Sequence, residues 1–314
     1  MNILLTGASS FTGYWFARVL AERGHTVYAT FRGSAQNYDG MRRRRIDALP
    51  ESVVRLWNAP SDSEELLNAT ARVARWDRLC LHGAHVTGYR EPGFDFAQAL
   101  KNNTDGLPRL LQHLAERGLQ RVVATGSVFE ANEGAGEEPL RGFSPYGLSK
   151  SLTWLAQEFW AQTLGLHMGK FVISNPFGPL EEPRFTAYLM KTWFAGKQAE
   201  VRTPLYIRDN IHVSRLACHY ADFAESLDGR AGTSRCAPMG YVESQGAFTL
   251  RFAGAMRERL GLECAVSVAE QKDFSEPMMR VNTQALPLPA EQWNEPTAWD
   301  ELAKYYRVEY SAPS

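Results

Sequence analysis

A tyrosine and a lysine four residues apart stand at the start of a predicted helix, where they can act as an acid/base pair. Residues 144–150 are Ser-Pro-Tyr-Gly-Leu-Ser-Lys, and a serine followed by proline is typical of a helix N-terminus. Residues i and i+4 share one helix face, so we expect the Lys150 ammonium about 4–5 Å from the Tyr146 phenol, where it lowers the pKa of that phenol. Such a tyrosine can exchange a proton with an alcohol or a ketone. The same spacing also occurs by chance, so the rest of the chain must decide.

A second stretch able to do chemistry is the glycine-containing turn after the first predicted strand. Residues 2–6 are apolar, and residues 7–13 lead into a helical pattern that ends near Gly24. The positions of the glycines, with a serine in place of the middle one, suit backbone N–H groups that hold a pyrophosphate at a helix N-terminus. A plain tight turn is the alternative. We expect a dinucleotide to be bound by Gly7, Ser9, Ser10, Phe11, Thr12 and Gly13.

The end of the second predicted strand indicates which coenzyme binds. An acidic residue there would take the ribose 2′-hydroxyl of NAD, but this chain has Phe31 followed by Arg32 and, two residues later, Ser34. A guanidinium can pair with a 2′-phosphate, so we favour NADP(H), with NAD(H) as the alternative. Asn58, after the third strand, is assigned to the same site. The arginines at 42–45 are expected in a solvated loop, with a second phosphate site as the alternative.

The order of predicted elements places these residues on an α/β fold. Short apolar runs alternate with helical patterns, which predicts a parallel sheet with helices on both faces. The pattern changes after Asn175, where several prolines follow. We predict a Rossmann doubly wound parallel sheet over residues 1–175, with a return near 205–240, and a smaller substrate-binding lobe from residues 176–204 and 240–314. The predicted strands are residues 2–6, 26–31, 53–57, 78–82, 121–125 and 171–174.

Composition limits the class of protein. The 314 residues carry a formal net charge of −1, which gives no general attraction to nucleic acid or to an anionic membrane. The N-terminus lacks the features of a signal peptide, and no apolar run is long enough for a membrane span. The four cysteines lie far apart without metal-ligand spacing. We therefore expect a cytoplasmic protein with reduced cysteines and no metal site.

Taken in order, the motifs resemble those of the extended short-chain dehydrogenase/reductases, and more narrowly the nucleotide-sugar epimerase, dehydratase and reductase group. The glycine turn and the Tyr-x-x-x-Lys helix carry this resemblance over residues 1–215, together with four further stretches. The last hundred residues match only loosely. The four stretches are His82-Gly83-Ala84, Asn103-x-x-Gly106, Asn175-Pro176-Phe177-Gly178-Pro179 and Arg208-Asp209-Asn210-Ile211-His212-Val213.

The resemblance implies a role for individual residues. Tyr146 would be the acid/base, and Lys150 would lower its pKa and hold the nicotinamide ribose. Thr125 falls in the position of the catalytic hydroxyl, with Ser127 two residues on. Coenzyme contacts are implied for His82, Gly83, Ala84 and Asn103, and substrate contacts for His85, Asn175, Arg208 and Arg280. For His85, packing is favoured over lining the pocket.

The same segment distinguishes the reactions of the group. Gly126 and Ser127 occupy places where the 4,6-dehydratases of the group have acids and where the epimerase-reductases have a cysteine nearby. Without these residues, the reaction of the group that remains is hydride transfer at one carbon. The Phe31-Arg32 site then favours an NADPH-dependent 4-ketoreductase of a nucleotide sugar over a 4-epimerase with bound NAD.

Three other expectations concern partners and competing functions. The group usually forms homodimers through the helices expected at residues 94–117 and 145–165, so we expect a homodimer. A reductase of a non-nucleotide ketone is a second enzymatic alternative. A non-enzymatic, coenzyme-sensing regulator is the third, although it predicts loss of the Tyr/Lys pair that this chain retains.

Overall fold

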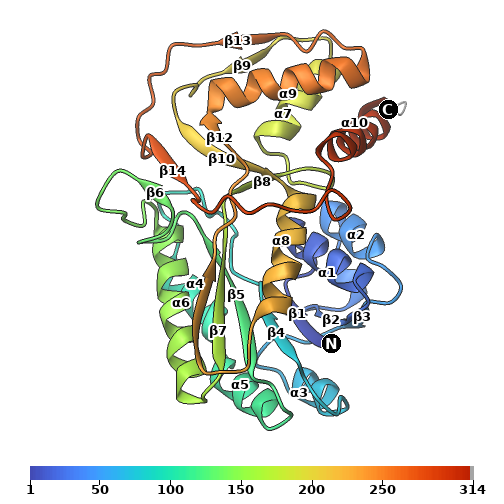
Figure 1. Cartoon of the computed structure of the whole chain (residues 1–314), viewed down its shortest axis with the longest axis vertical. Coiled ribbons are helices and arrows are strands. Elements are labelled where there is room, and N and C mark those ends of the chain that lie inside the picture. The colour runs from blue at the N-terminus through green and yellow to red at the C-terminus, as the bar shows by residue number, and fades with distance from the viewer. Residues whose placement is uncertain (312–314) are drawn as a thin grey trace.

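Seven parallel strands form the main sheet of the large lobe in the computed structural model, which describes residues 1–311 (Figure 1). Their order is β11-β7-β5-β4-β1-β2-β3, and every neighbouring pair is parallel. The predicted doubly wound α/β sheet is confirmed, and β11 is an edge strand that the sequence did not predict. The strands are β1 (Asn2–Thr6), β2 (Thr26–Thr30), β3 (Val54–Leu56), β4 (Arg78–Leu81), β5 (Arg121–Ser127), β7 (His167–Ile173) and β11 (Gly232–Cys236).

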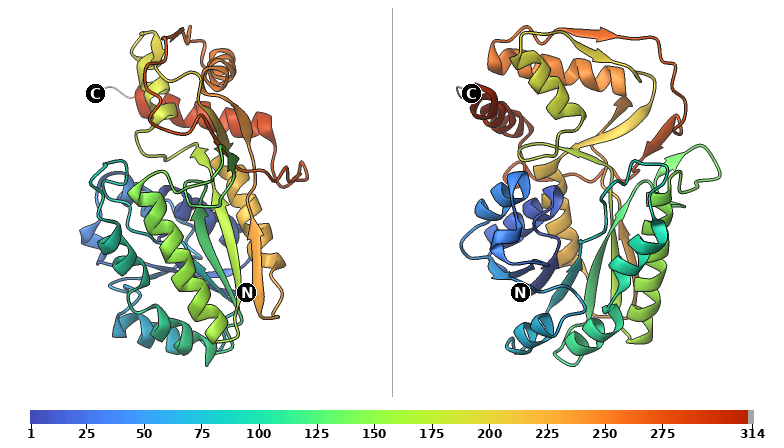
Figure 2. Two further views of the ribbon diagram at one scale, coloured as in Figure 1. Left: turned by 90° about the vertical axis from the view of Figure 1, so that its left-hand side faces the viewer. Right: turned by 180° about the vertical axis from the view of Figure 1, so that it is seen from behind.

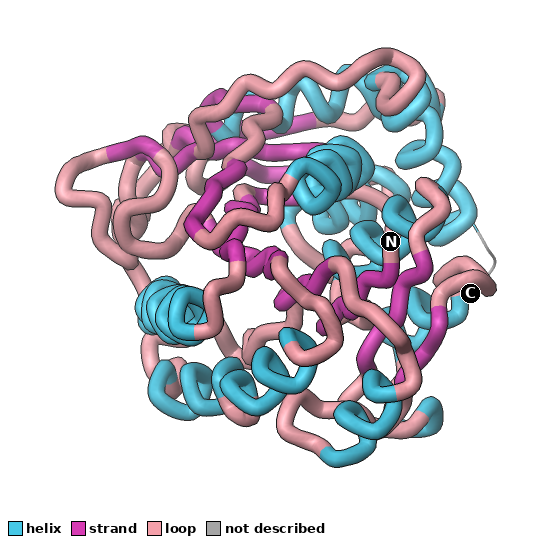
Figure 3. Tube along the Cα trace, turned by 60° about the horizontal axis from the view of Figure 1, so that its bottom comes forward, coloured by secondary structure: helices cyan, strands magenta, loops and turns pink. Residues whose placement is uncertain are grey.

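Helices cover both faces of this sheet (Figure 3). On one face lie α1 (Phe11–Glu22) and α8 (Val213–Ser226), joined by the stacked rings of Phe16 and Tyr220, whose centroids are 3.8 Å apart. The other face is covered by α3 (Glu64–Ala71), α5 (Leu107–Ala115) and α6 (Pro145–Thr163), which supply a second apolar core. Burial on both faces explains why the central strands are apolar almost throughout.

The single long helix expected at residues 94–117 is two helices, α4 (Phe96–Thr104) and α5. Gly106 separates them with a φ of 67°, in the left-handed region. A Cβ atom at Gly106 would also overlap the backbone of Asp62. The break is therefore set by a close approach that the apolar pattern of the sequence does not record.

The expectation of a solvated arginine loop at residues 42–45 is wrong, because these residues form α2 (Gly40–Asp47). Arg43 pairs with Asp47 at 2.9 Å and Arg44 with Glu309 at 2.7 Å. Arg45 is fully buried and contacts Glu182 at 2.8 Å. The helix is thus held by tertiary ion pairs with distant parts of the chain.

A second sheet and three helices make the small lobe, which lies above the main sheet (Figures 1 and 2). Phe177 and Trp299, whose ring centroids are 5.5 Å apart, lie at the centre of its core. Its helices are α7 (Phe185–Phe194), α9 (Gln245–Leu260) and α10 (Glu295–Ser311). Its strands are β12 (Tyr241–Ser244), β10 (Ile207–His212), β14 (Met279–Val281), β6 (Ala135–Gly136) and β8 (Asn175–Phe177), with a separate pair β9 (Ala199–Val201) and β13 (Val266–Val268).

The chain returns to the main lobe through α8 and β11, after β10 has joined the second sheet. Over residues 1–311, no helix has the length and apolar character needed to cross a membrane. All four cysteines are buried, and none of them is bonded to another. No cluster of three metal-ligating side chains occurs within the described part of the chain.

Candidate active site

The start of α6 places Tyr146 against the end of β5. Ser144 caps the helix, because its hydroxyl accepts a hydrogen bond from the N–H of Gly147 at 3.1 Å, and Pro145 is the first helical residue. A Cβ atom at Gly147 would overlap the carbonyl oxygen of Phe129. The glycine therefore allows the helix to approach the turn that follows β5, and this contact brings Tyr146 to Ser127.

The hydroxyl that acts on the Tyr146 phenol is that of Ser127, which lowers the pKa of the phenol. The hydroxyl of Thr125 lies 3.0 Å from Nδ1 of His82 instead. The carbonyl oxygen of Thr125 accepts a hydrogen bond from Lys150 at 2.6 Å. The structure thus brings all four predicted catalytic residues together, with Ser127 rather than Thr125 beside the phenol.

Tyr146 is not activated by Lys150 in this structure. Burial raises the pKa of the Tyr146 phenol well above its usual range, and the nearby Glu130 carboxylate raises it further. Arg184 and the Ser127 hydroxyl act in the opposite direction. No hydrogen bond joins the described side chains of Tyr146 and Lys150, because the ammonium is directed to the backbone of β5. The expected lowering of the phenol pKa by Lys150 is therefore absent here.

Aromatic side chains and one arginine enclose Tyr146. The ring centroids of Tyr89 and Phe94, both from the loop after β4, lie 5.2 and 6.1 Å from that of Tyr146. The guanidinium carbon of Arg184, the N-cap residue of α7, lies 6.0 Å from the centre of the Tyr89 ring. Tyr89 and Arg184 also line a cavity of about 390 Å³, whose other walls come from α2 and its N-terminal approach, from Val86 and Thr87 of the loop after β4, and from Glu182. Tyr146 thus lies beside an opening bordered by both lobes.

The turn between β1 and α1 has the geometry expected for a dinucleotide. Gly7 has a φ of 78°, and Ser10 caps α1 by accepting the N–H of Gly13 at 3.2 Å. A Cβ atom at Gly13 would overlap the carbonyl oxygen of Gly7. The first N–H groups of the helix, those of Phe11 and Thr12, have no acceptor within residues 1–311. These free donors at the positive end of a helix dipole fit a pyrophosphate.

His82 connects this turn to the catalytic strand. Its Nε2 lies 3.0 Å from the Ser10 hydroxyl and 3.1 Å from that of Thr12, while its Nδ1 contacts Thr125. Burial lowers the pKa of His82 to about 3, so the imidazole is neutral. The N–H groups of His82 and Gly83 donate to the Thr6 hydroxyl at 2.9 and 2.8 Å. The coenzyme turn and β5 therefore form one hydrogen-bonded unit.

The residues predicted to select the coenzyme follow β2 and β3, at the carboxyl ends of the parallel strands, as the glycine turn follows β1. Phe31 is buried and stacks on Trp57 with a centroid distance of 4.6 Å, so it cannot reach a ribose hydroxyl. Arg32 is exposed, and no hydrogen bond or ion pair holds its guanidinium within the described residues. The Ser34 hydroxyl donates to Asn37 at 2.7 Å, and the N–H of Asn58 donates to the carbonyl of Gly33 at 3.1 Å.

Two predicted substrate arginines lie side by side in the second sheet, because Arg208 of β10 is in register with Arg280 of β14. Arg208 pairs with Glu276 at 2.8 Å, and Arg280 donates to the carbonyl of Glu133 at 3.0 Å. Asn175 lies at the junction of the lobes, and its buried side-chain N–H₂ has no hydrogen-bond partner within the described chain. An orphaned buried donor is costly, which suits a position that binds a ligand.

Two other predicted residues brace the loop after β4. The amide oxygen of Asn103 accepts the N–H of His85 at 2.7 Å, and its N–H₂ donates to Thr153 of α6 at 3.1 Å. The His85 ring packs at 5.9 Å from Phe94 and shares a hydrogen bond of 3.1 Å with Asn102. Ala84, between these contacts, is half-buried. The expectation that His85 packs within the protein agrees with these contacts.

Three residues near the site were not predicted from the sequence: Tyr89, Glu130 and Lys170. Tyr89 comes from a loop without a motif. Glu130 and Lys170 form a buried ion pair of 2.6 Å directly behind Ser127. A charged residue inside the otherwise apolar β7 was the one available signal for that pair.

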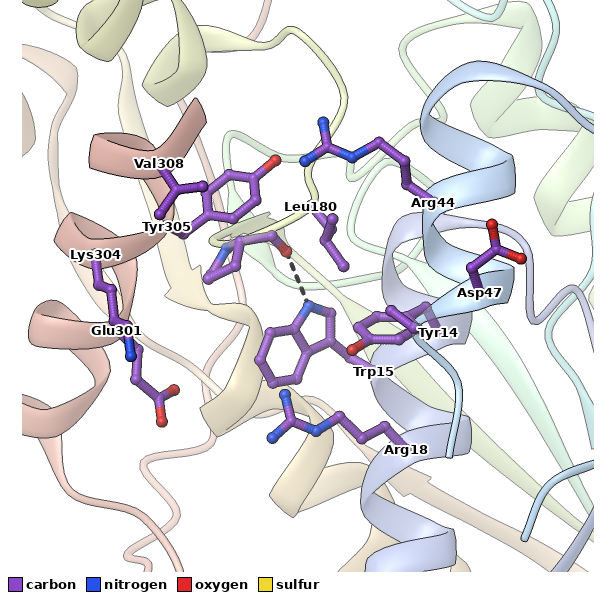
Figure 4. Close-up of a pocket in the computed structure, with 12 residues that line it drawn as sticks. Tyr14, Trp15, Arg18, Arg44, Asp47, Leu180, Glu301, Lys304, Tyr305 and Val308 are labelled. Carbon is purple, nitrogen blue, oxygen red and sulfur yellow. Dashed lines mark hydrogen bonds between the residues drawn. The ribbon is translucent and has the colours of Figure 1, made fainter. Parts of the chain in front are cut away.

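A larger hollow lies outside this site. It has a volume of about 620 Å³ and is bordered by α1, α2 and α10 (Figure 4). Its floor includes Trp15, whose ring N–H donates to the carbonyl of Pro179 at 3.1 Å. None of the four predicted catalytic residues lines it.

A family profile identifies the group to which the chain belongs. The profile of the NAD dependent epimerase/dehydratase family matches residues 3–228. The chain belongs to this family. It is therefore an enzyme that uses a nicotinamide dinucleotide, and the interpretation as a non-enzymatic regulator is set aside. The matched range holds the glycine turn, Tyr146 and Lys150, which confirms the resemblance found in the sequence.

Solved structures share the fold over the whole chain. UDP-glucuronic acid 4-epimerase from Bacillus cereus, crystallised with UDP-glucuronic acid and NAD, is 17% identical with a TM-score of 0.73, over 99% of this chain and 100% of that one. UDP-glucose 4-epimerase from Thermotoga maritima is 18% identical with a TM-score of 0.68, over 98% and 99%. A dTDP-glucose 4,6-dehydratase from Streptomyces venezuelae is 18% identical with a TM-score of 0.67, over 99% and 98%. At these identities the likeness establishes the fold of both lobes.

Proposed function

We propose that this enzyme is a nucleotide-sugar 4-epimerase, in which Tyr146 and Ser127 handle the proton of one sugar hydroxyl. The observation that carries the proposal is that the Ser127 hydroxyl acts on the Tyr146 phenol, whose ring packs on Tyr89, a residue that lines the cavity between the lobes. The sequence led us to prefer a 4-ketoreductase. The fold shared with two 4-epimerases along their entire length now favours the epimerase.

The residues of the chain divide the chemistry as follows. When bound, the nicotinamide coenzyme supplies the acceptor and donor of hydride. Tyr146 removes the proton of the substrate hydroxyl and returns it to the carbonyl oxygen, while Ser127 orients that oxygen by a hydrogen bond. Lys150 fixes β5 through the carbonyl of Thr125 and places a positive charge within the site. Thr125 and His82 keep the catalytic strand and the coenzyme turn in register.

Packing around Gly126 argues against dehydration. A Cβ atom at this position would lie 2.7 Å from Cε of Lys170 and 3.2 Å from Oε1 of Glu130. An acidic side chain therefore has no room where the dehydratases of the group have one. Glu130 does not replace it, because its carboxylate has no exposed surface and is held by Lys170 and the N–H of Ser127.

The division of labour between the lobes follows from the positions of these groups. We propose that residues 1–175 with 205–240 bind the coenzyme and that residues 176–204 and 240–314 bind the nucleotide sugar. Asn175 would bond the sugar or the diphosphate with its unpaired amide. Arg184 has no ion-pair partner in the described structure and faces Tyr146, which favours a sugar with an anionic substituent. The cytoplasmic location stays a prediction.

An NADPH-dependent 4-ketoreductase is the second candidate, and the coenzyme site supports it. Phe31 is buried where an acid would hold the ribose of NAD, and the exposed Arg32 can hold a 2′-phosphate. The two candidates differ in whether coenzyme is consumed. Epimerisation uses none in net terms, whereas reduction uses one NADPH for each sugar.

Replacing Arg32 tests the coenzyme assignment. We expect Arg32→Ala to weaken NADPH binding about 10- to 100-fold, the range for losing a charge-assisted hydrogen bond, and to leave NADH binding unchanged. Calorimetric titration of both coenzymes gives the comparison, with Arg75→Ala, a distant surface change, as the control. Equal effects on both coenzymes, or none, would remove Arg32 from the 2′-phosphate site.

The proposed function itself is tested with a panel of sugar nucleotides. We expect wild-type protein to convert one of UDP-glucose, UDP-glucuronic acid, UDP-N-acetylglucosamine or dTDP-glucose to its 4-epimer, without a change in the absorbance of reduced nicotinamide. Loss of NADPH with a 4-keto sugar would establish the reductase. Turnover of simple aryl ketones alone would point to a non-nucleotide substrate and contradict both candidates.

The outer face of α4 and α6 supports a homodimer. These helices lie on the outside of the main sheet (Figure 2). Both carry exposed apolar side chains. Phe159 and Leu155 are 59% and 57% exposed, and Leu148 and Phe96 add to the same two helices. An apolar helix face of this kind is typical of an oligomer interface. We propose that two copies pair through α4 and α6.

A charge on this face should separate the subunits. We expect Phe159→Glu to convert the dimer to a monomer, because a buried unpaired carboxylate at an interface is strongly unfavourable. Light scattering after size-exclusion chromatography measures the mass. Leu250→Glu, at an equally exposed position on α9, is the control and should leave the mass unchanged. A wild-type monomer, or a dimeric Phe159→Glu protein, would place the interface elsewhere or remove it.

A further inference from the structure

A chain of four charged side chains, three of them buried, runs behind the catalytic serine. Lys170 of β7 lies between the carboxylates of Glu130 and Glu133, at 2.6 and 2.7 Å. Glu133 in turn pairs with Arg235 of β11, whose Nε donates to it at 2.8 Å. The side chains of Lys170 and of both glutamates are at most 7% exposed. Burying these three charges costs free energy. The cluster therefore suggests a role other than that of an ordinary surface ion pair.

Glu130 is the member of this cluster that reaches the active site. Its Oε1 accepts the backbone N–H of Ser127 at 2.7 Å, and its own N–H donates to the carbonyl of Ser127 at 3.0 Å. These two bonds fix the turn that carries the Ser127 hydroxyl toward Tyr146. The stem of Lys170 packs against Gly126 from the other side, so the turn is held on both faces.

The same carboxylate acts on both ionisable catalytic groups. The groups that face Tyr146 are Glu130, Tyr89 of the loop after β4, Arg184 of α7 and Ser127. Burial lowers the pKa of Lys150, and of the two nearby charges Glu130, which raises that pKa, acts more strongly than Lys170, which lowers it. The charge of Lys150 in turn faces the neutral His82. The negative charge of Glu130 opposes ionisation of the phenol and favours protonation of the lysine.

We propose that Glu130 is a positioning residue that holds Ser127 in place and sets the balance of charge between Tyr146 and Lys150. Lys170 neutralises the carboxylate in part, and Glu133 with Arg235 orients Lys170. This role rests on the proposed function of Tyr146 as acid/base. Glu130 would act on that function through its charge, without touching a substrate atom.

Glu130→Gln tests the proposal with a near-isosteric change. The amide oxygen can still accept the N–H of Ser127, but the negative charge is lost. Because that charge opposes ionisation of the phenol, its removal should move the acidic limb of the pH profile of kcat/KM to lower pH, by about half to one unit. Glu133→Gln is the matched control. It removes a carboxylate equally close to Lys170 but one step further from the serine, and we expect it to leave the limb unmoved.

A purely structural ion pair predicts a different result. In that case both variants lower Tm and neither moves the pH profile, which would overturn the proposal. An equal shift in both variants would overturn it as well, since the effect would then belong to the whole cluster. If Glu130→Gln does not fold, the double variant Glu130→Gln/Lys170→Met removes both partners of the pair. Glu130 is among the charges that act on the Tyr146 phenol and Lys170 is not, so we expect a shift in the same direction.

A measurement without substrate separates this proposal from the proposed function. The near-ultraviolet absorbance of tyrosinate is titrated in the coenzyme-loaded protein, and the same curve for Tyr146→Phe is subtracted to isolate one phenol. We expect the remaining transition to move to lower pH in Glu130→Gln and to stay in place in Glu133→Gln. That result would hold even if no sugar nucleotide of the panel were turned over, whereas an unmoved transition in Glu130→Gln would contradict the role of Glu130 alone.

Discussion

Tyr146→Phe should lower kcat about 10²- to 10⁴-fold, the usual contribution of a positioned acid/base, while coenzyme binding stays within about twofold. The variant loses only the phenol oxygen, which is the atom that meets the Ser127 hydroxyl. The ring keeps its contacts with Tyr89 and Phe94, so Tm should change little. Steady-state kinetics on the substrate found in the panel give kcat, and calorimetry gives the coenzyme affinity.

The control for this change is another tyrosine whose hydroxyl lies away from the site. Tyr188 of α7 is 43% exposed, and its hydroxyl makes two long hydrogen bonds with the backbone of Glu200: it donates to the carbonyl at 3.4 Å and accepts the N–H at 3.2 Å. We expect Tyr188→Phe to behave as wild type. If Tyr146→Phe retained near-normal kcat, the proton would have to travel by another group, and the assignment of α6 as the catalytic helix would be wrong.

Gly13→Ala should weaken coenzyme binding at least about tenfold and destabilise the fold by about 1–3 kcal/mol, because the added methyl group has no space. It would overlap the carbonyl of Gly7 and lie 2.8 Å from both Cδ2 of His82 and the Ser10 hydroxyl oxygen. To make room, the turn must move, and the N–H groups of Phe11 and Thr12 move with it. Calorimetric titration with coenzyme and thermal unfolding measure the two effects.

Gly254→Ala, in the middle of α9, is the matched control. A Cβ atom at that helical position meets no atom within 4 Å, so alanine should stabilise the helix by about 0.5–1 kcal/mol. Coenzyme affinity should not change. A Gly13→Ala protein that bound coenzyme normally would show that the turn tolerates the shift and that the pyrophosphate is held elsewhere.

The main sheet and the two local motifs of the site could be predicted from the sequence, because both depend on residues close together in the chain. The apolar runs that become β1 and β5 are buried on two faces and therefore stand out. The turn at residues 7–13 and the Tyr146–Lys150 pair are likewise encoded within one turn or one helix. Both motifs could therefore be recognised without knowledge of any contact between distant residues.

The remaining elements depend on contacts between distant residues. Helix α2 is a run of arginines without an apolar face, and it is held by Glu182 from the middle of the chain and Glu309 from near its C-terminus. The second sheet is built from strands of two to six residues that pair across long separations, such as β6 with β14. Propensity and periodicity carry no signal for such pairings.

The same reason explains which parts of the site were missed. The choice of Ser127 over Thr125 depends on His82, which takes the Thr125 hydroxyl. Glu130 and Lys170 meet only because β5 and β7 are neighbours in the sheet. Arg184 reaches Tyr146 from the start of α7 in the small lobe. Each of these relations is set by the packing of the sheet and the lobes, and a single sequence does not reveal it.

The most direct test of the central claim is proton NMR of the epimerisation carried out in deuterated water. Chemistry at C4 by hydride transfer, with Tyr146 moving only the hydroxyl proton, predicts a 4-epimer that keeps protium at C4 and at the neighbouring carbons. Deuterium at C4 or beside it would show that a carbon-bound proton exchanges with solvent, and that result would contradict the site described for Tyr146 and Ser127.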